Sequence, residues 1–297
     1  MSSYLEATAR ERLAAVLDAH SFIEFLPPAD RIVSPHLGQL DAPVSFDDGV
    51  AVGRASLGGA AIFVAAQEGG FMGGAVGEVH GAKLAGMLRR AISEQADAVL
   101  LLLETGGVRL HEANAGLIAV SEVMRAVLDT RAAGIPVLAL IGGSNGCFGG
   151  MGIVARCTNG IIMSEEGRLA MSGPEVIETA SGVEEFDSRD RALVWRTSGG
   201  KHRYLMGDCQ RIVADDIAAF RAAARDAVAA LTGTQVELTL EALEAEQRML
   251  DDRIARFGAL TDPIDIWSAM QIPDAANIPM LDVDSFIAAA DKRRMGV

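Results

Sequence analysis

The sequence is poor in cysteine, with only three among its 297 residues. Cys147, Cys157 and Cys209 form no CxxC pair, and an odd number of cysteines does not suggest a disulfide framework. Without clustered cysteines the sequence also offers no zinc ribbon. We therefore expect free thiols, no bound metal and a cytoplasmic protein.

The sequence also lacks a long apolar run and an excess of positive charge. No stretch approaches the roughly 20 apolar residues of a membrane-spanning helix. The N-terminal segment SSYLEATARERLAAVLDAHSF is polar and charged where a signal peptide needs an apolar core. Lysine and arginine number 26 against 40 acidic residues, which gives a net charge of -14. We expect a soluble, unexported protein that binds neither membranes nor nucleic acid.

What is present is a large apolar content, 50% of all residues, which is enough for a substantial core. Residues Ala7–Ala19 have the apolar spacing of an amphipathic helix and are followed by a break at Pro27-Pro28 and a loop through Pro43. We expect this N-terminal segment to act as a clamp on the rest of the fold.

The middle of the chain has the pattern of an α/β protein with parallel strands. Val50–Ser56 and Ala60–Ala66 flank a double glycine and predict a hairpin. Between later apolar runs, Ala113–Ala133 has helical spacing. Strands buried on both faces are expected at Ala98–Leu103 and Ile135–Ile141, with a third at Gly160–Met163 after a shorter helical crossover in Gly149–Arg156.

Towards the C-terminus the residue pattern changes from strand-and-helix alternation to helices alone. Asp216–Leu231 and Leu238–Phe257 have helical patterns separated by a Thr-Gly-Thr turn, and Val283–Asp291 predicts one more short helix. We place a domain boundary at this turn. Residues 1–231 then form the main domain with its clamp, and residues 232–297 form a helical extension.

Two glycine-rich turns follow the buried strands. The first reads ETGGVRLHE from Glu104, and the second reads GGSNGCFGGMG from Gly142. Glycine permits positive φ and close ligand approach, so backbone N–H groups at the following helix starts can bind anionic oxygen. Neither turn has the Gly-Lys-Ser/Thr of a Walker loop or the GxGxxG register. A plainer interpretation is that the glycines only make tight turns and close helix packing.

At these turns the sequence resembles the acyl-CoA carboxyltransferases. ETGGVRLHEA is similar to their Gly-Gly-Ala-Arg-Met/Ile-Gln-Glu turn, and GGFMGGAVGEVHGAKL is similar to their GGSMGSVVGEK segment. IPVLALIGGSNGCFGGMGIVA and RLAMSGPEVIE resemble the second turn and the Gly-Pro-x-Val-Ile-Glu element. These four ordered matches cover roughly residues 50–180. The resemblance implies a crotonase-like (ClpP/crotonase) α/β fold, a spiral of ββα units with added C-terminal helices.

Within that superfamily the sequence most resembles the beta subunits of biotin-independent malonate decarboxylases. It lacks the four-cysteine zinc ribbon of the bacterial carboxylase subunit, and Val108 and His111 replace the usual Ala and Gln. The stretch Ser181–Cys209 also resembles the decarboxylases. The resemblance implies decarboxylation of a malonyl thioester to an acetyl thioester, without biotin or metal. It also implies a homologous gamma subunit, an acyl carrier protein with a CoA-derived arm, and an acyl carrier protein transferase (alpha) subunit.

Loss of carbon dioxide leaves an enolate, whose oxygen needs hydrogen-bond donors. We expect backbone amides to supply them, from Gly107 or Val108 in the first turn and from Gly149 or Gly150 in the second. His111, beside the first turn, is a candidate proton donor, as is Glu112, although a lone histidine near a turn more often has a structural packing role. In the second turn, Cys147 at a possible helix start is a candidate nucleophile. Acyl-pocket candidates, each also explained by core packing, are Phe148, Met151 and Met171.

The densest basic stretch of this acidic chain is a candidate site for the phosphates of the carrier arm or for an acidic carrier protein. The plainer interpretation is an exposed helix and loop with ordinary charges, since charge clusters are usually just solvated. Its members are Arg189, Arg191, Arg196, Lys201, His202 and Arg203.

Three other functions remain open. A carboxyltransferase subunit of a biotin-dependent acyl-CoA carboxylase would use the same fold and amides. An enoyl-CoA hydratase or hydrolase would need a carboxylate pair or a nucleophile, for which Glu104 and Glu112 are the candidates. A non-catalytic scaffold subunit would not need its glycine turns to face a ligand.

Overall fold

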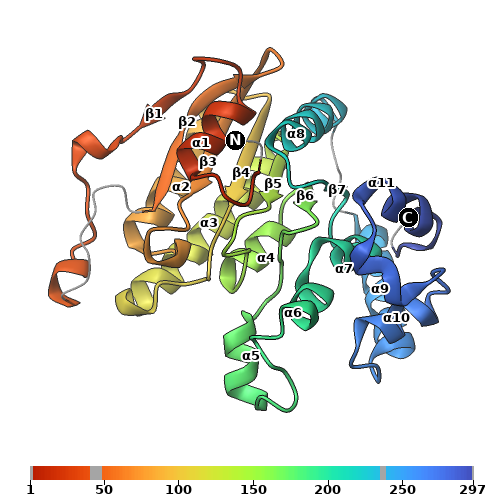
Figure 1. The fold of residues 1–297 in the computed structure, drawn as a ribbon. Helices are drawn as coiled ribbons and strands as arrows, with labels where there is room; N and C mark the ends of the chain where they lie inside the picture. The colour runs from red at the N-terminus through yellow and green to blue at the C-terminus, as the bar shows by residue number, and fades with distance from the viewer. Residues whose placement is uncertain (1–2, 41–48, 235–238, 296–297) are drawn as a thin grey trace.

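The computed structural model describes residues 3–40, 49–234 and 239–295 (Figure 1). Within these ranges one seven-stranded sheet carries its strands in sequence order. The strands are β1 (Ile23–Phe25), β2 (Val50–Leu57), β3 (Ala60–Gln67), β4 (Ala98–Leu103), β5 (Val137–Ile141), β6 (Gly160–Ser164) and β7 (Arg211–Val213). The first three are antiparallel and β3 to β7 are parallel. The loop expected through Pro43 and the helix start expected at Leu238 lie outside the described residues.

The hairpin predicted from the double glycine is confirmed, with β2 and β3 paired along their full length. Gly58 and Gly59 have φ angles of 59° and 87°, which glycine adopts without steric cost. The Asp18 carboxylate accepts a hydrogen bond from each of these two amides at 3.1 Å. This contact ties the end of the N-terminal segment to the hairpin.

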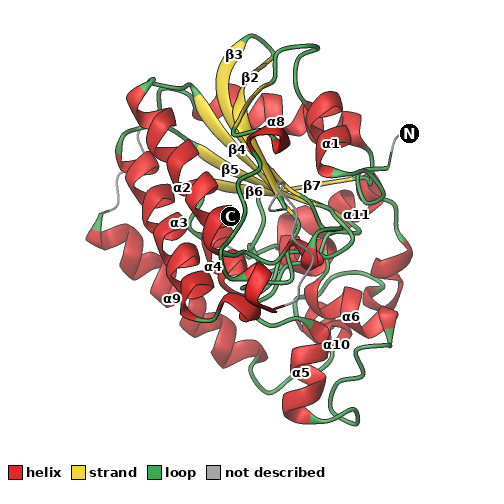
Figure 2. Ribbon diagram, turned by 90° about the vertical axis from the view of Figure 1, so that its left-hand side faces the viewer, coloured by secondary structure: helices red, strands yellow, loops and turns green. Residues whose placement is uncertain are grey.

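Helices cover both faces of the sheet. They are α1 (Ala9–Val16), α2 (Glu78–Ser93), α3 (Asn114–Ala132), α4 (Gly150–Arg156), α5 (Pro174–Ser181), α6 (Arg191–Ser198), α7 (Gly200–Leu205), α8 (Ile217–Leu231), α9 (Leu240–Phe257), α10 (Pro263–Ala269) and α11 (Val283–Ala290). Figure 2 shows α2, α3 and α4 on one side and α1 and α8 on the other. Each side of the sheet has its own buried apolar cluster. Val99 and Leu101 of β4 pack in the cluster with α2, α3 and α4, whereas Leu100 and Leu102 pack in the cluster with α1 and α8. The continuous apolar runs are therefore strands buried on both faces, as predicted.

The segments after the parallel strands form a second, minimal ladder. Val76 bridges Val108, and Cys147 bridges both Thr105 and Leu169, all in parallel. The strands β3, β4, β5 and β6 are thus each followed by a bridge residue and then by a helix. This is the ββα repeat that the sequence analysis expects, and it brings the glycine turns together at one edge of the sheet.

No local pattern predicts α2, because Gly81 and Gly86 lower its helix propensity. The structure gives Gly81 a packing reason, since a Cβ atom added there would lie 2.5 Å from the Cβ of Ala119 in α3. The glycine therefore lets α2 and α3 approach closely. The sequence patterns also did not predict the strands β1 and β7, the helix α10, or the short helices α5, α6 and α7.

The C-terminal elements pack on the main body. Trp267 of α10 and Phe286 of α11 belong to the same buried cluster as Tyr204 of α7. Arg253 of α9 donates to Asp208 at 3.1 Å, while most of α9 is exposed. The predicted helices α8 and α11 are confirmed to within one residue of their expected ends, and α9 ends at Phe257 as predicted. Among the described residues, no helix has both the length and the apolar character of a membrane span.

Candidate functional site

In the first glycine turn the neighbouring amides of Gly107 and Val108 differ in their hydrogen bonding. Gly107 has a φ of 121°, and its N–H donates to Thr105 Oγ1 at 3.0 Å. The Gly107 carbonyl accepts from Val76 at 2.8 Å. The next amide, that of half-buried Val108, makes no hydrogen bond to any residue that the structure describes. Of the two candidates in this turn, Val108 keeps a donor for a ligand.

The second turn has the same arrangement. Gly149 has a φ of 62°, and its N–H donates to the Met171 carbonyl at 2.9 Å. The N–H of Gly150, the first residue of α4, has no acceptor within the described parts of the chain. Its free amide is expected because the first N–H groups of a helix have no intrahelical partner. Gly150 is half-buried, so a ligand can reach it.

The two turns are bonded to each other. Thr105 donates to the Gly146 carbonyl at 2.8 Å, and Phe148 donates to the Thr105 carbonyl at 3.0 Å. A Cβ atom added to Gly149 would lie 3.8 Å from the Val108 nitrogen. The free amides of Val108 and Gly150 therefore lie where the two turns are in contact. Two such donors are suited to an oxygen that develops negative charge.

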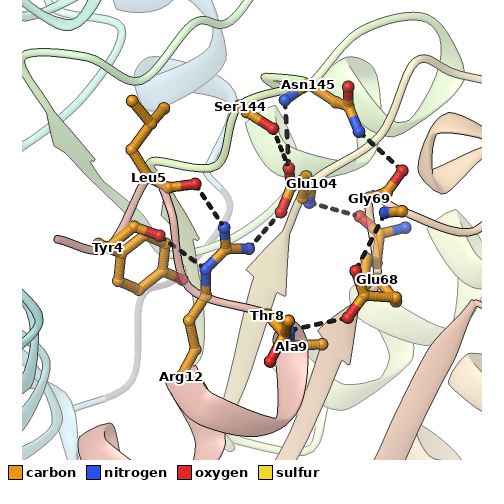
Figure 3. Close-up of polar contacts among 12 residues, drawn as sticks. Tyr4, Leu5, Thr8, Ala9, Arg12, Glu68, Gly69, Glu104, Ser144 and Asn145 are labelled. Atoms are coloured by element: carbon orange, nitrogen blue, oxygen red, sulfur yellow. Dashed lines mark hydrogen bonds and ion pairs between the residues drawn. The ribbon is translucent and has the colours of Figure 1, made fainter. Parts of the chain in front are cut away.

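Glu104, at the start of the first turn, is 4% exposed and accepts hydrogen bonds from the second turn. Its Oε1 atom accepts from Ser144 Oγ at 3.0 Å and from the Asn145 amide at 3.2 Å. Its Oε2 atom accepts from Arg12 of α1 (Figure 3). Glu104 thus has a structural role, because its carboxylate oxygens bind α1 and the second turn. This argues against a general-acid role in a hydratase. Sequence analysis alone gives no signal for this bridge.

Arg109 and Glu112 form a second buried ion pair, 2.9 Å long. Burial alone would raise the pKa of Glu112, but the hydrogen bonds from the Glu78 amide and from Arg109 hold this pKa below its usual value. The ionised carboxylate joins the first turn to the start of α2. A buried carboxylate paired with Arg109 argues against Glu112 as the proton donor.

His111 lies on the short 3-10 turn Leu110–Glu112 and is exposed beside the first turn. Cys147 of the second turn is completely buried, and burial raises the pKa of its thiol. A thiol held in its neutral form is a poor nucleophile. The structure therefore argues against Cys147 as a nucleophile and leaves His111 accessible to a substrate.

The acyl-pocket candidates also differ in their exposure to solvent. Phe148 and Met151 are buried in the fold, so core packing explains them. Met171 is 68% exposed beside the second turn. Of these three, only Met171 is placed to contact a substrate.

The basic stretch is divided between the interior and the surface. Lys201 donates to the Pro279 carbonyl at 3.0 Å, and Arg203 donates to Asp208 at 3.1 Å. His202 is buried, and burial lowers its pKa to about 3, so it carries no charge near neutral pH. Arg189 and Arg191 are exposed. Of the basic stretch, these two arginines are therefore the ones most open to a ligand, and the carrier site stays a prediction.

Arg191 reaches the second turn through a stack of side chains. Its guanidinium lies 5.0 Å from the Trp195 ring centroid, and that of Arg168 lies 4.5 Å from the same centroid. Arg168 also donates to the Ser144 carbonyl and lies 5.6 Å from the Phe148 ring centroid. Arg168 was not predicted as a site residue, although the RLAMSGPEVIE segment contains it. The stack places two cations beside the candidate site.

Exposed apolar side chains, here called the apolar rim, lie on the elements that follow the turns. These side chains come from the 3-10 turn and from α3, α4, α5 and the loop before α5: Leu110, Leu117, Ile118, Ile153, Met171 and Val176. A surface pocket beside α4 is lined by Ile153, Met171 and Arg203 among others. Exposed apolar surface of this kind marks a binding or interaction site. The described residues contain no cluster of three or more His, Cys, Asp or Glu suited to a metal ion.

Comparison with known proteins agrees with this geometry. Residues 6–252 match the carboxyl transferase domain model. The chain belongs to the carboxyl transferase family. It is 41% identical to the malonyl-S-ACP:biotin-protein carboxyltransferase MADC of Malonomonas rubra, and the alignment covers 98% of this chain and 96% of that protein.

Solved structures of carboxyl transferase family members are similar as well. A Pseudomonas malonate decarboxylase hetero-tetramer in complex with malonate contains a chain with 41% identity and a TM-score of 0.78, covering 84% of this chain and 91% of that one. The Pseudomonas MdcD-MdcE hetero-dimer of the same enzyme gives 37% identity and a TM-score of 0.67, covering 84% and 97%. The crotonase-like fold and the resemblance to malonate decarboxylase subunits are confirmed.

Proposed function

We propose that this carboxyl transferase family member is the beta subunit of a malonate decarboxylase and converts a malonyl thioester on an acyl carrier protein to an acetyl thioester. The observation that carries the proposal is the pair of adjacent free amides, Val108 and Gly150. Its similarity to a malonate decarboxylase bound to malonate supports the substrate. The name of the Malonomonas relative supports a carrier-linked thioester.

In the proposed reaction the amides of Val108 and Gly150 hold the thioester carbonyl oxygen. Breaking the bond to the carboxylate releases carbon dioxide, and the electron pair delocalises onto that oxygen as an enolate. Each donor is worth about 2.7–4 kcal/mol when charge develops on the oxygen. His111 is the proposed donor of the proton that converts the enolate carbon to a methyl group.

We assign the carrier arm to the cationic stack beside the second turn. Its phosphate would face Arg191 and Arg168, with Arg189 nearby in sequence, because these arginines lie at or near the surface. Lys201 and Arg203 have partners within the chain, so their contribution would be limited to the walls of the site. The CoA-derived arm then enters as part of the substrate, and the chain needs no resident cofactor.

The proposed partners follow from the apolar rim. A homologous gamma subunit covering Leu117 and Ile118 would complete the site, in keeping with the hetero-dimer and hetero-tetramer of the Pseudomonas enzyme. An acyl carrier protein and an acyl carrier protein transferase (alpha) subunit complete the proposed cytoplasmic complex. On this proposal residues 232–297 are an extension of the catalytic domain.

A second candidate is carboxyl transfer to a biotin protein. The name of the Malonomonas relative favours it, and its 41% identity equals that of the Pseudomonas decarboxylase chain. Both reactions generate the same enolate at the same amides. They differ in the fate of the carboxyl group, which leaves as carbon dioxide or moves to the biotin nitrogen.

The deciding experiment is carbon dioxide release from a malonyl thioester by the complex purified with this chain, with and without avidin to sequester biotin. Release that ignores avidin supports the decarboxylase. Avidin-sensitive turnover establishes the biotin-linked reaction instead. An intact complex with no turnover in either assay would leave the scaffold function.

A further inference from the structure

A buried carboxylate joins the two glycine turns. Glu104 begins the first turn, and its Oε1 atom accepts hydrogen bonds from Ser144 and Asn145 of the second. The Asn145 side chain then donates to the Gly69 carbonyl at 2.9 Å. Figure 3 shows Glu104 at the centre of these contacts, between the second turn and α1. Glu104 therefore joins the turns through its side chain, in addition to the backbone hydrogen bonds that Thr105 makes with Gly146 and Phe148.

The charge of Glu104 is balanced from the N-terminal helix, 92 residues earlier in the chain. Arg12 is 1% exposed and its Nη1 atom donates to Glu104 Oε2. Arg12 is itself held in place, because its Nε atom donates to the Tyr4 carbonyl at 2.9 Å and its guanidinium lies 4.6 Å from the Tyr4 ring centroid. The N-terminal helix thus presents a fixed cation to the turns.

The site is shaped around the carboxylate. A Cβ atom added at Gly69 would lie 2.4 Å from Glu104 Oε1, and one added at Gly143 would lie 2.4 Å from Glu104 Oε2. Glycine at both positions leaves room for the carboxylate and little more. Because it is tightly enclosed and accepts several hydrogen bonds, the Glu104 carboxylate is held in a single position. A side chain fixed in this way can keep the two turns at a constant distance.

A buried ion pair is weak evidence for stability, because desolvation of two charges offsets most of their attraction. Its geometry matters more here. Oxyanion donors act only within about 2.7–3.1 Å of the oxygen, and a misplacement of about 1 Å can lower a rate a hundredfold. A rotation of Glu104 would break the hydrogen bonds from Ser144 and Asn145, which lie in the segment that leads to Gly150.

We propose that Arg12 and Glu104 are positioning residues that set the spacing between the Val108 and Gly150 amides. The role of those amides rests on the proposed function. The N-terminal helix is then part of the catalytic machinery through Arg12, although no part of it belongs to either turn. The pair acts on the transition state through the turns and does not contact the substrate.

The test compares Arg12→Met with Arg221→Met in the purified complex. Arg221 also anchors the N-terminal helix, through Asp18 at 2.6 Å and the Val16 carbonyl, but it does not touch the turns. We expect Arg12→Met to lower kcat roughly ten- to a hundredfold with KM within about twofold, because the misplaced donors act on the transition state. Arg221→Met is expected to keep kcat within about twofold, and Arg12→Lys to recover part of the loss.

A second readout does not depend on activity. Hydrogen–deuterium exchange of peptides covering residues 105–112 and 146–152 is expected to speed up in Arg12→Met and not in Arg221→Met. Should Arg12→Met fail to assemble, Ser144→Ala removes only one donor to Glu104 and undergoes the same two measurements. Unchanged kcat and exchange in these variants overturns the proposal. A wild-type complex without turnover contradicts the proposed function, whereas the exchange comparison still decides whether the pair positions the turns.

Discussion

Gly107 and Gly149 lie backbone against backbone, so close that a Cβ atom added to Gly149 would be 3.0 Å from the Gly107 Cα. Both have positive φ, so neither position accepts a side chain without strain. The contact also brings the free amides of Val108 and Gly150 into one region. Tight turns and a ligand site are therefore two consequences of the same glycines.

Replacing Gly150 by proline removes one of the proposed oxyanion donors. We expect kcat to fall about 10²- to 10³-fold, equivalent to about 2.7–4 kcal/mol. The first position of a helix tolerates proline, but any Cβ atom there would meet Val120 Cγ1 at 2.6 Å. Gly150→Ala is the matched control, since it has the same Cβ and keeps the N–H. Equal kcat values for the two variants in the assembled complex would remove Gly150 from the mechanism.

Two glycines of α2 are expected to respond oppositely to alanine. Gly86 has open space around its Cβ position, so Gly86→Ala should raise stability by about 0.8–1 kcal/mol through helix propensity. Gly81 packs on Ala119 at 2.5 Å, so Gly81→Ala should cost about 1–3 kcal/mol by overpacking. Thermal unfolding of the two variants beside the wild type measures both effects. A shift of the same sign in both would contradict this account of the contact between α2 and α3.

The parallel strands could be predicted from the sequence because each is buried on both faces and reads as an unbroken apolar run. Ala98–Leu103 is the observed β4 residue for residue. Helix α2 could not be predicted in the same way, since Gly81 is chosen for contact with α3 and weakens the helical pattern. The domain boundary near residue 231 stays a prediction, because Trp267 shares a buried cluster with Tyr204 of the main body.

The site was predictable only in part. The glycine turns are local and visible in sequence, whereas the choice of Val108 over Gly107 depends on a hydrogen bond to Thr105 Oγ1 that only the structure shows. The partnership of Arg12 and Glu104 joins segments 92 residues apart, a separation beyond any local pattern. Long-range polar contacts of this kind are set by the tertiary fold.

Breaking the buried pair of Arg109 and Glu112 is expected to destabilise the protein. Glu112→Gln leaves the Arg109 charge without its carboxylate partner, at a cost of about 3–5 kcal/mol. The folded pKa of Glu112 lies below its usual 4.5. Ionised Glu112 therefore stabilises the fold above about pH 4.5, and this contribution is lost as the pH falls through the lower folded pKa. Thermal unfolding between pH 7 and pH 3 should show less acid sensitivity in the variant.

The control for that experiment is Glu122→Gln. Glu122 pairs with Arg89 and Arg125 at the surface, where water and salt screen the charges. We expect its unfolding temperature at pH 7 to match the wild type. A similar fall in unfolding temperature in both variants would mean that burial does not increase the contribution of the Arg109–Glu112 pair to stability.

The three thiols are expected to react in an order set by burial. Cys147 and Cys209 are completely buried, and burial raises the pKa of both thiols. Cys157 is half-buried, and the Arg131 and Arg156 charges partly offset the rise in its pKa. Since the thiolate is the reactive form, iodoacetamide on the native complex should modify Cys157 first and leave turnover intact. Peptide mass spectrometry reads the order. Rapid native labelling of Cys147 with parallel loss of turnover would instead support a covalent thiol mechanism at the second turn.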